Sequence, residues 1–410
     1  MGDLSYFGEN IIGSEIIKIA QKLKEISKTR KIYNYTIGDF DSEVHSIPKQ
    51  LEELIGSYYL MKKTNYPLGK GEVSLRDEIS LYLKREHGID FSPEEVLIGA
   101  GARPLIYLLY KTILDPNDKV VIPVPSWNNN HYSTLHNTNA CYIETKPEND
   151  FFPTFEDIER EISDARLICL CSPQNPTGKV MSPDLLKKIC QLVVDENKRR
   201  GDGRKVYLFF DQIYSELSQV GFFGPTQLVP ECKKYVIHID GISKSLCATG
   251  VRVGWMFADE HVIKKATEIF SHIGAWAPKP EQLAVAQYLK NYVGYQSFLT
   301  KKKQQFGDVF DKFTEFLSYL KLQNFSIDYL NPDGAIYISI YLQKSLEFES
   351  TERFLDFIID NYGIGLVPFE YFGSKENKGW FRLSIGTLDI QDIDDHFYNF
   401  ESMIRFLESL

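Results

Sequence analysis

The sequence predicts an α/β fold in which a large domain holds a mainly parallel, seven-stranded sheet between helices. Between about residues 95 and 259, short apolar runs alternate with stretches of helical periodicity. The runs are almost continuously apolar, which is typical of strands buried on both faces. At 410 residues, the chain is long enough for two domains.

Seven apolar runs are expected to form the strands of this sheet. They occupy residues 95–99, 119–123, 141–144, 166–170, 206–210, 235–239 and 252–257. Helical patterns fill several gaps, as at residues 183–194, where apolar positions recur every three or four residues behind the N-cap candidate Ser182. A longer helical stretch follows at about 290–320, then a strand at 334–340 and an amphipathic helix from about Gln391.

Composition narrows the possible partners and compartment. The net charge of −10 argues against general binding to nucleic acid or to anionic membranes. The basic run Lys301-Lys302-Lys303 is expected to be a solvated helix face. Six cysteines without a C-x-x-C pair indicate buried free thiols in a reducing compartment. With neither a signal peptide nor a membrane-spanning apolar stretch, we expect a cytoplasmic protein.

Polar side chains follow successive predicted strands. Asn175-Pro-Thr-Gly comes after one apolar run, Asp211-Gln-Ile-Tyr214 after the next, and Lys244 after a third, eight residues before Arg252. The exits of parallel strands are where an open α/β sheet builds its ligand site. A lysine, a carboxylate, a phenol, an amide and an arginine are together what holding pyridoxal phosphate requires.

From about Gly38 to Arg382 these motifs resemble, in content and order, the class I/II aminotransferases, the fold type I pyridoxal-phosphate enzymes of the aspartate aminotransferase fold. The resemblance implies a smaller α+β domain formed by the N- and C-terminal segments. We therefore expect an N-terminal arm and part of this domain at 1–48, the large cofactor-binding domain at 49–295, and the rest of the small domain at 296–410.

In this reading Lys244 forms a Schiff base with the cofactor and then serves in turn as general base and acid at the substrate α-carbon. Asp211 keeps the ring nitrogen protonated, while Tyr214 and Asn175 bind the phenolic oxygen. Each residue also has a simpler interpretation: a solvated lysine, a helix-capping aspartate, or a turn at Asn175-Pro-Thr-Gly.

The phosphate is expected at a helix N-terminus that follows Gly99-Ala-Gly101. There the backbone N–H groups around Ala102 and Arg103 would face the anion, and Arg252 would add a charged contact. The resemblance also places Ser243 beside the cofactor. Glycines at 99 and 101 without a third at position 104 do not make a dinucleotide fingerprint.

Four further residues match family positions. Trp127 fits the aromatic that stacks on the cofactor ring, although tryptophan is commonly core filler. Tyr66 fits the tyrosine that reaches the phosphate of the partner subunit in a homodimer with shared active sites; it could also be an ordinary loop residue. Arg382 matches the clamp for the substrate α-carboxylate, and Gly38 the glycine beside the substrate.

Some positions depart from the common family pattern. Gly241 replaces a frequent serine, Cys247 and Val251 are unusual neighbours of the lysine, and the stretch 275–282 lacks the usual Ser/Thr-Asn-Pro. Arg103 suggests recognition of a second carboxylate, as in aspartate or glutamate; the alternative is a phosphate-side or surface arginine.

The predicted function is a transaminase that moves an amino group from an L-amino acid to a 2-oxo acid such as 2-oxoglutarate. A β- or γ-eliminating lyase could use the same lysine, aspartate and arginine, so it remains the alternative. The eight scattered histidines form no metal motif, and no G-x-S-x-G sequence offers a hydrolase nucleophile. A ligand-sensing regulator would need an attached DNA-binding module. We do not expect one, because the segment before Gly38 is too short to hold it and because the chain is acidic.

Overall fold

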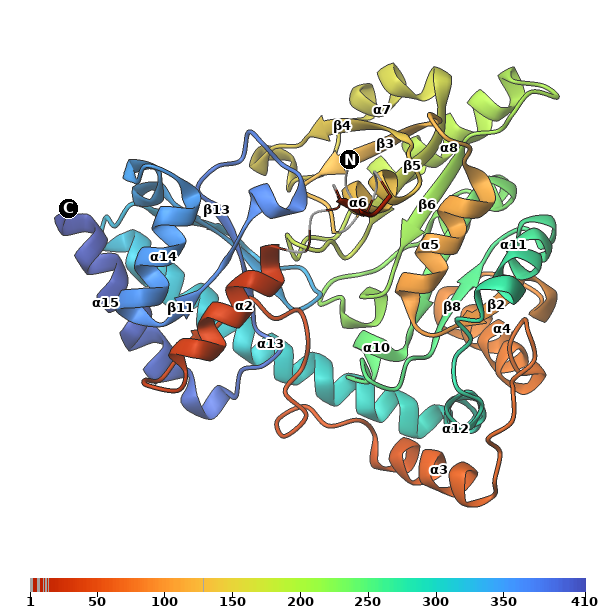
Figure 1. Ribbon diagram of the computed structural model, residues 1–410, viewed down its shortest axis with the longest axis horizontal. Helices are drawn as coiled ribbons and strands as arrows, with labels where there is room; N and C mark the ends of the chain where they lie inside the picture. Colours follow the sequence, from red (N-terminus) through yellow and green to blue (C-terminus); the bar gives the residue numbers. More distant parts are fainter. Residues whose placement is uncertain (1–2, 6–7, 10, 12, 14, 128) are drawn as a thin grey trace.

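The computed structural model describes residues 3–5, 8–9, 11, 13, 15–127 and 129–410. Figure 1 shows a large part built on a twisted sheet and a smaller part that holds the C-terminus. The long helix α13 (Tyr292–Leu322) runs between them.

The large sheet has the order β2-β8-β7-β6-β5-β3-β4. Its strands are β2 (Val96–Gly99), β3 (Lys119–Val124), β4 (Asn139–Glu144), β5 (Ala165–Cys171), β6 (Tyr207–Asp211), β7 (Val236–Gly241) and β8 (Gly254–Phe257). Only β8 runs antiparallel to its neighbours β2 and β7, while the other pairs are parallel. The predicted seven-stranded, mainly parallel sheet is confirmed.

Helices cover both faces of this sheet because alternate strand residues point to opposite sides. Helices α5 (Ala102–Ile113) and α11 (Glu260–Ile273) share a core with Ile122 of β3. Helices α7 (Phe155–Glu161) and α8 (Pro183–Arg199) share another with Val121, the preceding residue. Ser182 caps α8 as predicted, its hydroxyl accepting from the Leu185 N–H at 3.3 Å.

A third core lies at the β2–β8 end of the sheet. It is closed by α3 (Lys49–Leu60), α4 (Val73–His87) and α12 (Lys279–Lys290). Both α3 and α4 pack against α12.

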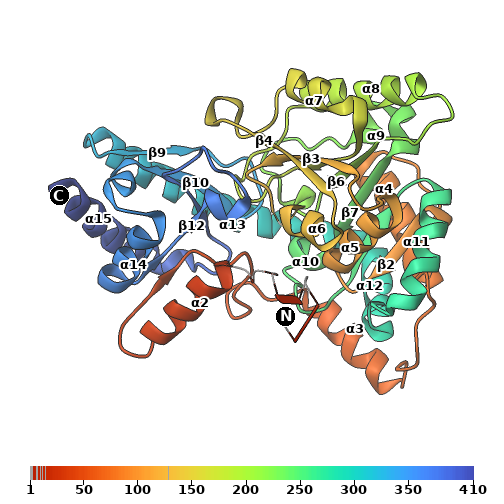
Figure 2. The same ribbon diagram turned by 45° about the horizontal axis from the view of Figure 1, so that its top comes forward.

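The small part combines the two ends of the chain (Figure 2). Its antiparallel sheet has the order β12-β13-β10-β9. These strands are β9 (Ile327–Leu330), β10 (Tyr337–Leu342), β12 (Val367–Pro368) and β13 (Trp380–Ser384). A short parallel pair joins β1 (Tyr33–Asn34) to β11 (Ile364–Gly365). Helices α2 (Glu15–Ile26), α14 (Thr351–Tyr362) and α15 (Ile393–Ser409) contribute to one common core.

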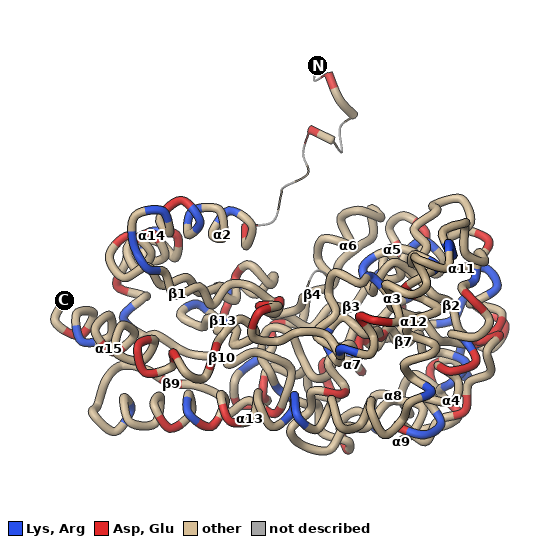
Figure 3. Tube along the Cα trace, turned by 90° about the horizontal axis from the view of Figure 1, so that it is seen from below, with Lys and Arg blue, Asp and Glu red and all other residues tan. Residues whose placement is uncertain are grey.

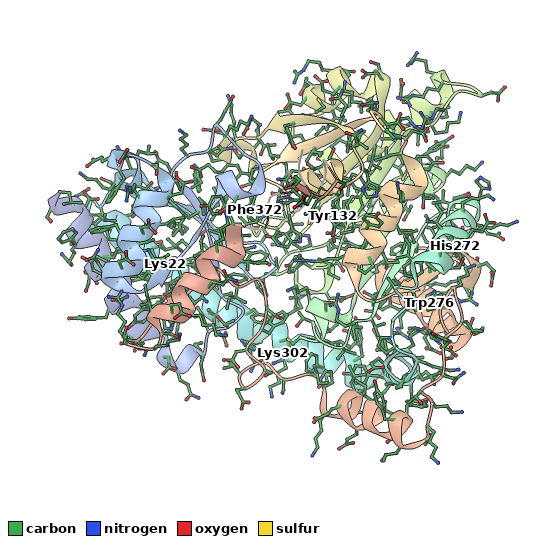
Figure 4. The ribbon with its side chains drawn as sticks, in the orientation of Figure 1. Lys22, Tyr132, His272, Trp276, Lys302 and Phe372 are labelled. Atoms are coloured by element: carbon green, nitrogen blue, oxygen red, sulfur yellow. The ribbon has the colours of Figure 1, made fainter. Side chains whose placement is uncertain are left out.

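Helix α13 belongs to both parts. Tyr295 and Leu299 are buried in the core beside α4 and α12, whereas Phe306 and the apolar residues after it are buried in the small-domain core. The expectation of a solvated face at Lys301-Lys302-Lys303 is wrong for Lys302, which is buried and lies near the Phe298 ring (Figure 4). The proposed divisions after residues 48 and 295 stay a prediction.

Acidic and basic residues intermingle over both parts of the molecule (Figure 3). In the described chain, no helix is long and apolar enough to cross a bilayer. No cluster of three or more His, Cys, Asp or Glu among the described residues could hold a metal ion. All six cysteines are free thiols, and four of them are buried: Cys169, Cys190, Cys232 and Cys247.

Candidate active site

The predicted polar residues meet at one edge of the large sheet. Asp211 is the last residue of β6 and pairs in register with Cys171 of β5 and Ile239 of β7. Asn175 follows β5, and Lys244 lies in the short helix α10 (Ile242–Ser245) after β7. Because these strands are parallel, their carboxyl ends deliver all three side chains to the same edge.

The Lys244 amine is half-buried and donates a hydrogen bond to the Gly38 carbonyl at 2.5 Å. The ring centroids of Phe40 and Tyr214 lie 5.2 and 5.7 Å from its Nζ. Loss of hydration lowers the pKa of Lys244 to about 8, although the negative charge of Asp39 opposes this shift. At pH 7 roughly one such amine in ten is neutral, far more than for a free lysine.

Asp211 is a buried carboxylate whose Oδ1 accepts a 3.1 Å hydrogen bond from the Ile213 N–H. Burial raises its pKa to about 6, and this single backbone donor only partly offsets the effect. A positively charged partner would restore the ionised form, and a protonated pyridine nitrogen is such a partner.

A cradle for a phosphate lies at the start of α5. Gly101 has φ +82°, and a Cβ added to it would come within 2.4 Å of the Arg252 guanidinium, so only glycine fits beside this arginine. Arg252 donates to the carbonyls of Thr249 and Ala100. Burial and the nearby charge of Arg103 lower the Arg252 pKa. Two guanidinium groups that repel each other at a helix N-terminus favour binding of a dianion.

Arg382 is fully buried on β13. Its Nη1 donates to the Asn175 side-chain oxygen at 2.9 Å, and its Nη2 donates to the Thr36 carbonyl at 2.6 Å. The guanidinium lies between the rings of Tyr337 and Phe372, 4.6 and 5.0 Å from their centroids. Phe372 is labelled in Figure 4, on the small-domain side.

Tyr214, Tyr337 and Gly38 form a third group of contacts in the site. The two tyrosine hydroxyls are 2.5 Å apart, and burial raises the pKa of both phenols. A Cβ added to Gly38 would lie 2.6 Å from the Tyr337 hydroxyl. The absence of a side chain at residue 38 therefore lets this segment pass over Tyr337 and reach Lys244.

The remaining predicted residues differ in how closely they join this group. Trp127 is half-buried, and its backbone N–H donates to the Asn175 carbonyl at 3.2 Å. The exposed Arg103 guanidinium lies 5.2 Å from the Trp127 ring. Ser243 is buried beside Lys244, and Ala102 begins α5. Tyr66 is different, since it is 83% exposed and its ring contacts Trp276 at 5.9 Å.

The sequence reading missed four residues of the site: Asp39, Phe40, Tyr337 and Phe372. Alternation along β10 could have revealed Tyr337, because Ser339, two residues later, pairs in register with Arg382. Asp39 directly follows Gly38, and its carboxylate accepts from Thr249 at 2.7 Å. Phe372 lies in a short 3-10 turn, whose position no local pattern specifies.

Gly241, the departure from the frequent serine, has a steric cause. A Cβ at this position would lie 2.8 Å from the Gly254 Cα and 2.9 Å from the Val253 carbonyl oxygen. Strands β7 and β8 approach too closely there for a serine side chain.

These observations fit pyridoxal 5′-phosphate. A buried carboxylate with a raised pKa suits the ring nitrogen, a lysine with a lowered pKa suits the aldehyde, and the Gly101–Arg252 cradle suits the phosphate. The fold and the site thus define a pyridoxal-phosphate enzyme.

Comparison with known proteins agrees with this class. A family model described as aminotransferase class I and II matches residues 30–396. Aspartate aminotransferase of Bacillus subtilis is 26% identical over 356 residues, 85% of each chain. Asparagine–oxo-acid transaminase of Streptococcus mutans is 28% identical over 330 residues, 78% of this chain and 79% of that protein. The structure of Thermus thermophilus aspartate aminotransferase with maleate superposes with a TM-score of 0.86 at 24% identity, covering 98% of this chain and 99% of that one.

The chain belongs to the class I and II aminotransferase family. It is accordingly an amino-group transferase of the EC 2.6.1 type, and pyridoxal 5′-phosphate is its cofactor. The expected family, fold class, enzyme class and cofactor are confirmed.

Proposed function

We propose that this transaminase takes its amino group from a dicarboxylic L-amino acid of the aspartate or glutamate type and gives it to a 2-oxo acid such as 2-oxoglutarate. The observation that carries this proposal is the placement of Arg382 and Arg103. One guanidinium is buried and bonded to Asn175, and the other is exposed and lies 5.2 Å from the Trp127 ring. A substrate with two carboxylates has a cation for each.

Each residue has a definite task in this scheme. When bound, pyridoxal phosphate supplies an aldehyde that takes up the amino group and a ring that accepts electrons. Lys244 moves a proton to and from the substrate α-carbon, and its lowered pKa suits both directions near neutral pH. Asp211 holds the ring-nitrogen proton, Tyr214 and Asn175 donate to the phenolic oxygen, and Arg382 orients the α-carboxylate.

The phosphate is held by the backbone N–H groups that follow Gly101, at Ala102 and Arg103, together with Arg252 and Ser243. Trp127 stacks on the ring. Within the described residues no side chain caps the first turn of α5, so its N–H groups can face the phosphate.

Replacing the lysine tests the mechanism directly. Lys244→Ala is expected to remove the visible absorbance of the lysine-bound cofactor and to abolish transamination, because no other amine takes over the proton transfer. Lys301→Ala, on the exposed side of α13, is the control and should retain both properties. Transamination by Lys244→Ala at the wild-type rate would eliminate the mechanism.

Product analysis separates the transaminase from a lyase that uses the same residues. The transaminase releases the donor's 2-oxo acid only in step with consumption of an acceptor. Formation of an oxo acid together with ammonia, without any acceptor, would identify elimination instead.

The dicarboxylate preference is tested with Arg103→Ala. We expect kcat/KM for aspartate to fall by about 10- to 100-fold, since a charge-assisted contact is lost, with a much smaller change for an aromatic donor. An equal loss for both donors would assign Arg103 to the phosphate. The relatives from Bacillus subtilis and Streptococcus mutans carry names of aspartate and asparagine transaminases, which agrees with a short polar donor.

We also propose a cytoplasmic homodimer with shared active sites. Tyr66 is 83% exposed, and α3 ends in the exposed residues Tyr59 and Leu60, which the exposed Met61 follows. The stretch after α11 supports this loop, as Trp276 contacts Tyr66 and Lys279 lies 3.4 Å from Asn65. An exposed apolar group of this kind suits burial against a second copy, which brings Tyr66 to the phosphate of the partner.

Subunit mixing tests the shared site. Lys244→Ala and Tyr66→Phe subunits are refolded separately and together. Each shared site takes Lys244 from one subunit and Tyr66 from the other. In a mixed dimer, one site therefore contains both substitutions and the other contains neither, so activity should recover above that of either parent. A monomer in sedimentation analysis, or no recovery, would reject the shared site.

A further inference from the structure

Tyr337 makes a contact that the family motifs in the sequence did not suggest. It lies on β10 of the small domain, is 1% exposed, and its hydroxyl is 2.5 Å from that of Tyr214 in the large domain. The two rings meet edge to face, with centroids 5.5 Å apart. One hydrogen bond thus joins the two domains inside the active site.

The surroundings fix the Tyr337 side chain in place. Its ring lies against the Arg382 guanidinium, and its hydroxyl occupies the space that a Cβ on Gly38 would need. Its backbone lies close to that of Gly178, since a Cβ added at Gly178 would come within 2.2 Å of the Tyr337 carbonyl oxygen. Tyr337 therefore has little freedom to turn its hydroxyl away from Tyr214.

The count of protons decides the direction of the bond. Each phenol carries one hydrogen, so each can donate once and can accept as well. Once Tyr214 donates to the phenolic oxygen of the cofactor, it has no proton left for Tyr337. Tyr337 must then be the donor and Tyr214 the acceptor. A hydroxyl that accepts a hydrogen bond becomes a stronger donor itself.

We propose that Tyr337 is a positioning residue whose hydroxyl donates to Tyr214 and so strengthens the bond from Tyr214 to the cofactor's phenolic oxygen. This inference rests on the proposed role of Tyr214. Stronger donation stabilises negative charge on that oxygen and weakens its hold on the proton of the adjacent Lys244–cofactor linkage. With the cofactor bound, that proton would be lost at a lower pH than in a protein without the Tyr337 hydroxyl.

Tyr337→Phe tests this proposal because it keeps the ring beneath Arg382 and removes only the hydroxyl. The measurement is the midpoint pH of the visible absorbance change of the cofactor-loaded protein, recorded without substrate. We expect the midpoint to rise by roughly half a pH unit. Tyr214→Phe should raise it by about one unit or more, since it removes the direct bond to the charged oxygen.

Two further variants keep the result interpretable. Tyr341→Phe, on the same strand with its ring against Trp380, should leave the midpoint unchanged. In the double variant Tyr214→Phe/Tyr337→Phe, the second change should add nothing, because the relay acts only through Tyr214.

The outcomes are separable. An unchanged midpoint in Tyr337→Phe, or equal shifts in the presence and absence of the Tyr214 hydroxyl, would overturn the inference while leaving the transaminase intact. If Tyr214→Phe itself fails to move the midpoint, the role proposed for Tyr214 is wrong. If the wild-type protein shows no titrating visible band, the proposed function fails at Lys244.

Discussion

The two walls of the active site are built by different structural rules. On the large-domain side, Asp211, Asn175 and Lys244 follow the carboxyl ends of parallel strands. On the small-domain side, Arg382 and Tyr337 project from the interior of antiparallel strands. The first wall would bind and activate the cofactor, and the second would hold the substrate carboxylate. The difference means that variants of the two walls should fail in different measurable ways.

The largest effect is expected on the large-domain side, at Asp211. Asp211→Asn removes the negative charge that keeps the ring nitrogen protonated, so the ring loses most of its capacity to accept electrons. We expect turnover to fall by about 100- to 1,000-fold with substrate KM little changed. Steady-state kinetics with aspartate and 2-oxoglutarate measure both quantities. A variant with normal turnover and a raised KM would contradict the division between the walls.

The same carboxyl should also make stability depend on pH in the cofactor-free protein. Its pKa is about 6 when folded, above the value of about 3.9 for an unfolded chain. Between these values the folded state binds more protons, so the contribution of Asp211 becomes less favourable as pH rises. Asparagine does not titrate in this range.

The unfolding free energy of Asp211→Asn relative to wild type should therefore increase by on the order of 2–3 kcal/mol from about pH 4 to about pH 7. Urea denaturation of both proteins at several pH values measures this difference. A difference that stays constant with pH would mean that Asp211 is already ionised and stabilised in the cofactor-free fold.

A smaller effect is expected on the small-domain side, from Arg382→Lys. Lysine cannot contact both the Asn175 side chain and the Thr36 carbonyl in the planar geometry of arginine. We expect KM for the amino donor to rise by roughly 10-fold or more, with the visible cofactor band retained. Arg405→Lys, at an exposed position of α15, is the matched control. Loss of the band in Arg382→Lys would show that this wall also holds the cofactor.

The same difference explains what could be predicted from the sequence. All seven strands of the large sheet are visible as apolar runs, and Asp211 and Lys244 stand at or just beyond their ends. On this side of the molecule, the local sequence pattern therefore predicts both the strands and the site residues that follow them. Arg382 was identified only through its resemblance to a family position, because nothing in Trp380-Phe-Arg-Leu-Ser distinguishes a clamp from a surface ion pair.

Tyr337 and Lys302 show where local pattern is insufficient. Tyr337 is positioned by a contact between segments far apart in the chain. Tyr337 meets Tyr214 across 123 residues. Lys302 belongs to a basic run that suggests exposure, yet α13 buries it beside Phe298. Periodicity reports which residues share a face, but it does not report which partner will cover that face.

Helix α13 connects the two sides of the active site mechanically. It is one uninterrupted helix of 31 residues, anchored by Tyr295 and Leu299 at one end and by the residues from Phe306 onward at the other. Both sides of the active site are thus attached to the same helix. Any approach of Arg382 toward Lys244 must therefore bend α13 between its two buried ends. Gly307 lies where the second anchor begins, and glycine costs a helix interior about 1 kcal/mol relative to alanine. We therefore expect the stiffness of α13 between its anchors to depend on this turn. The turn packs close to the site, because the Phe306 ring lies 5.7 Å from the Phe40 ring and Phe40 lies 5.2 Å from the Lys244 Nζ.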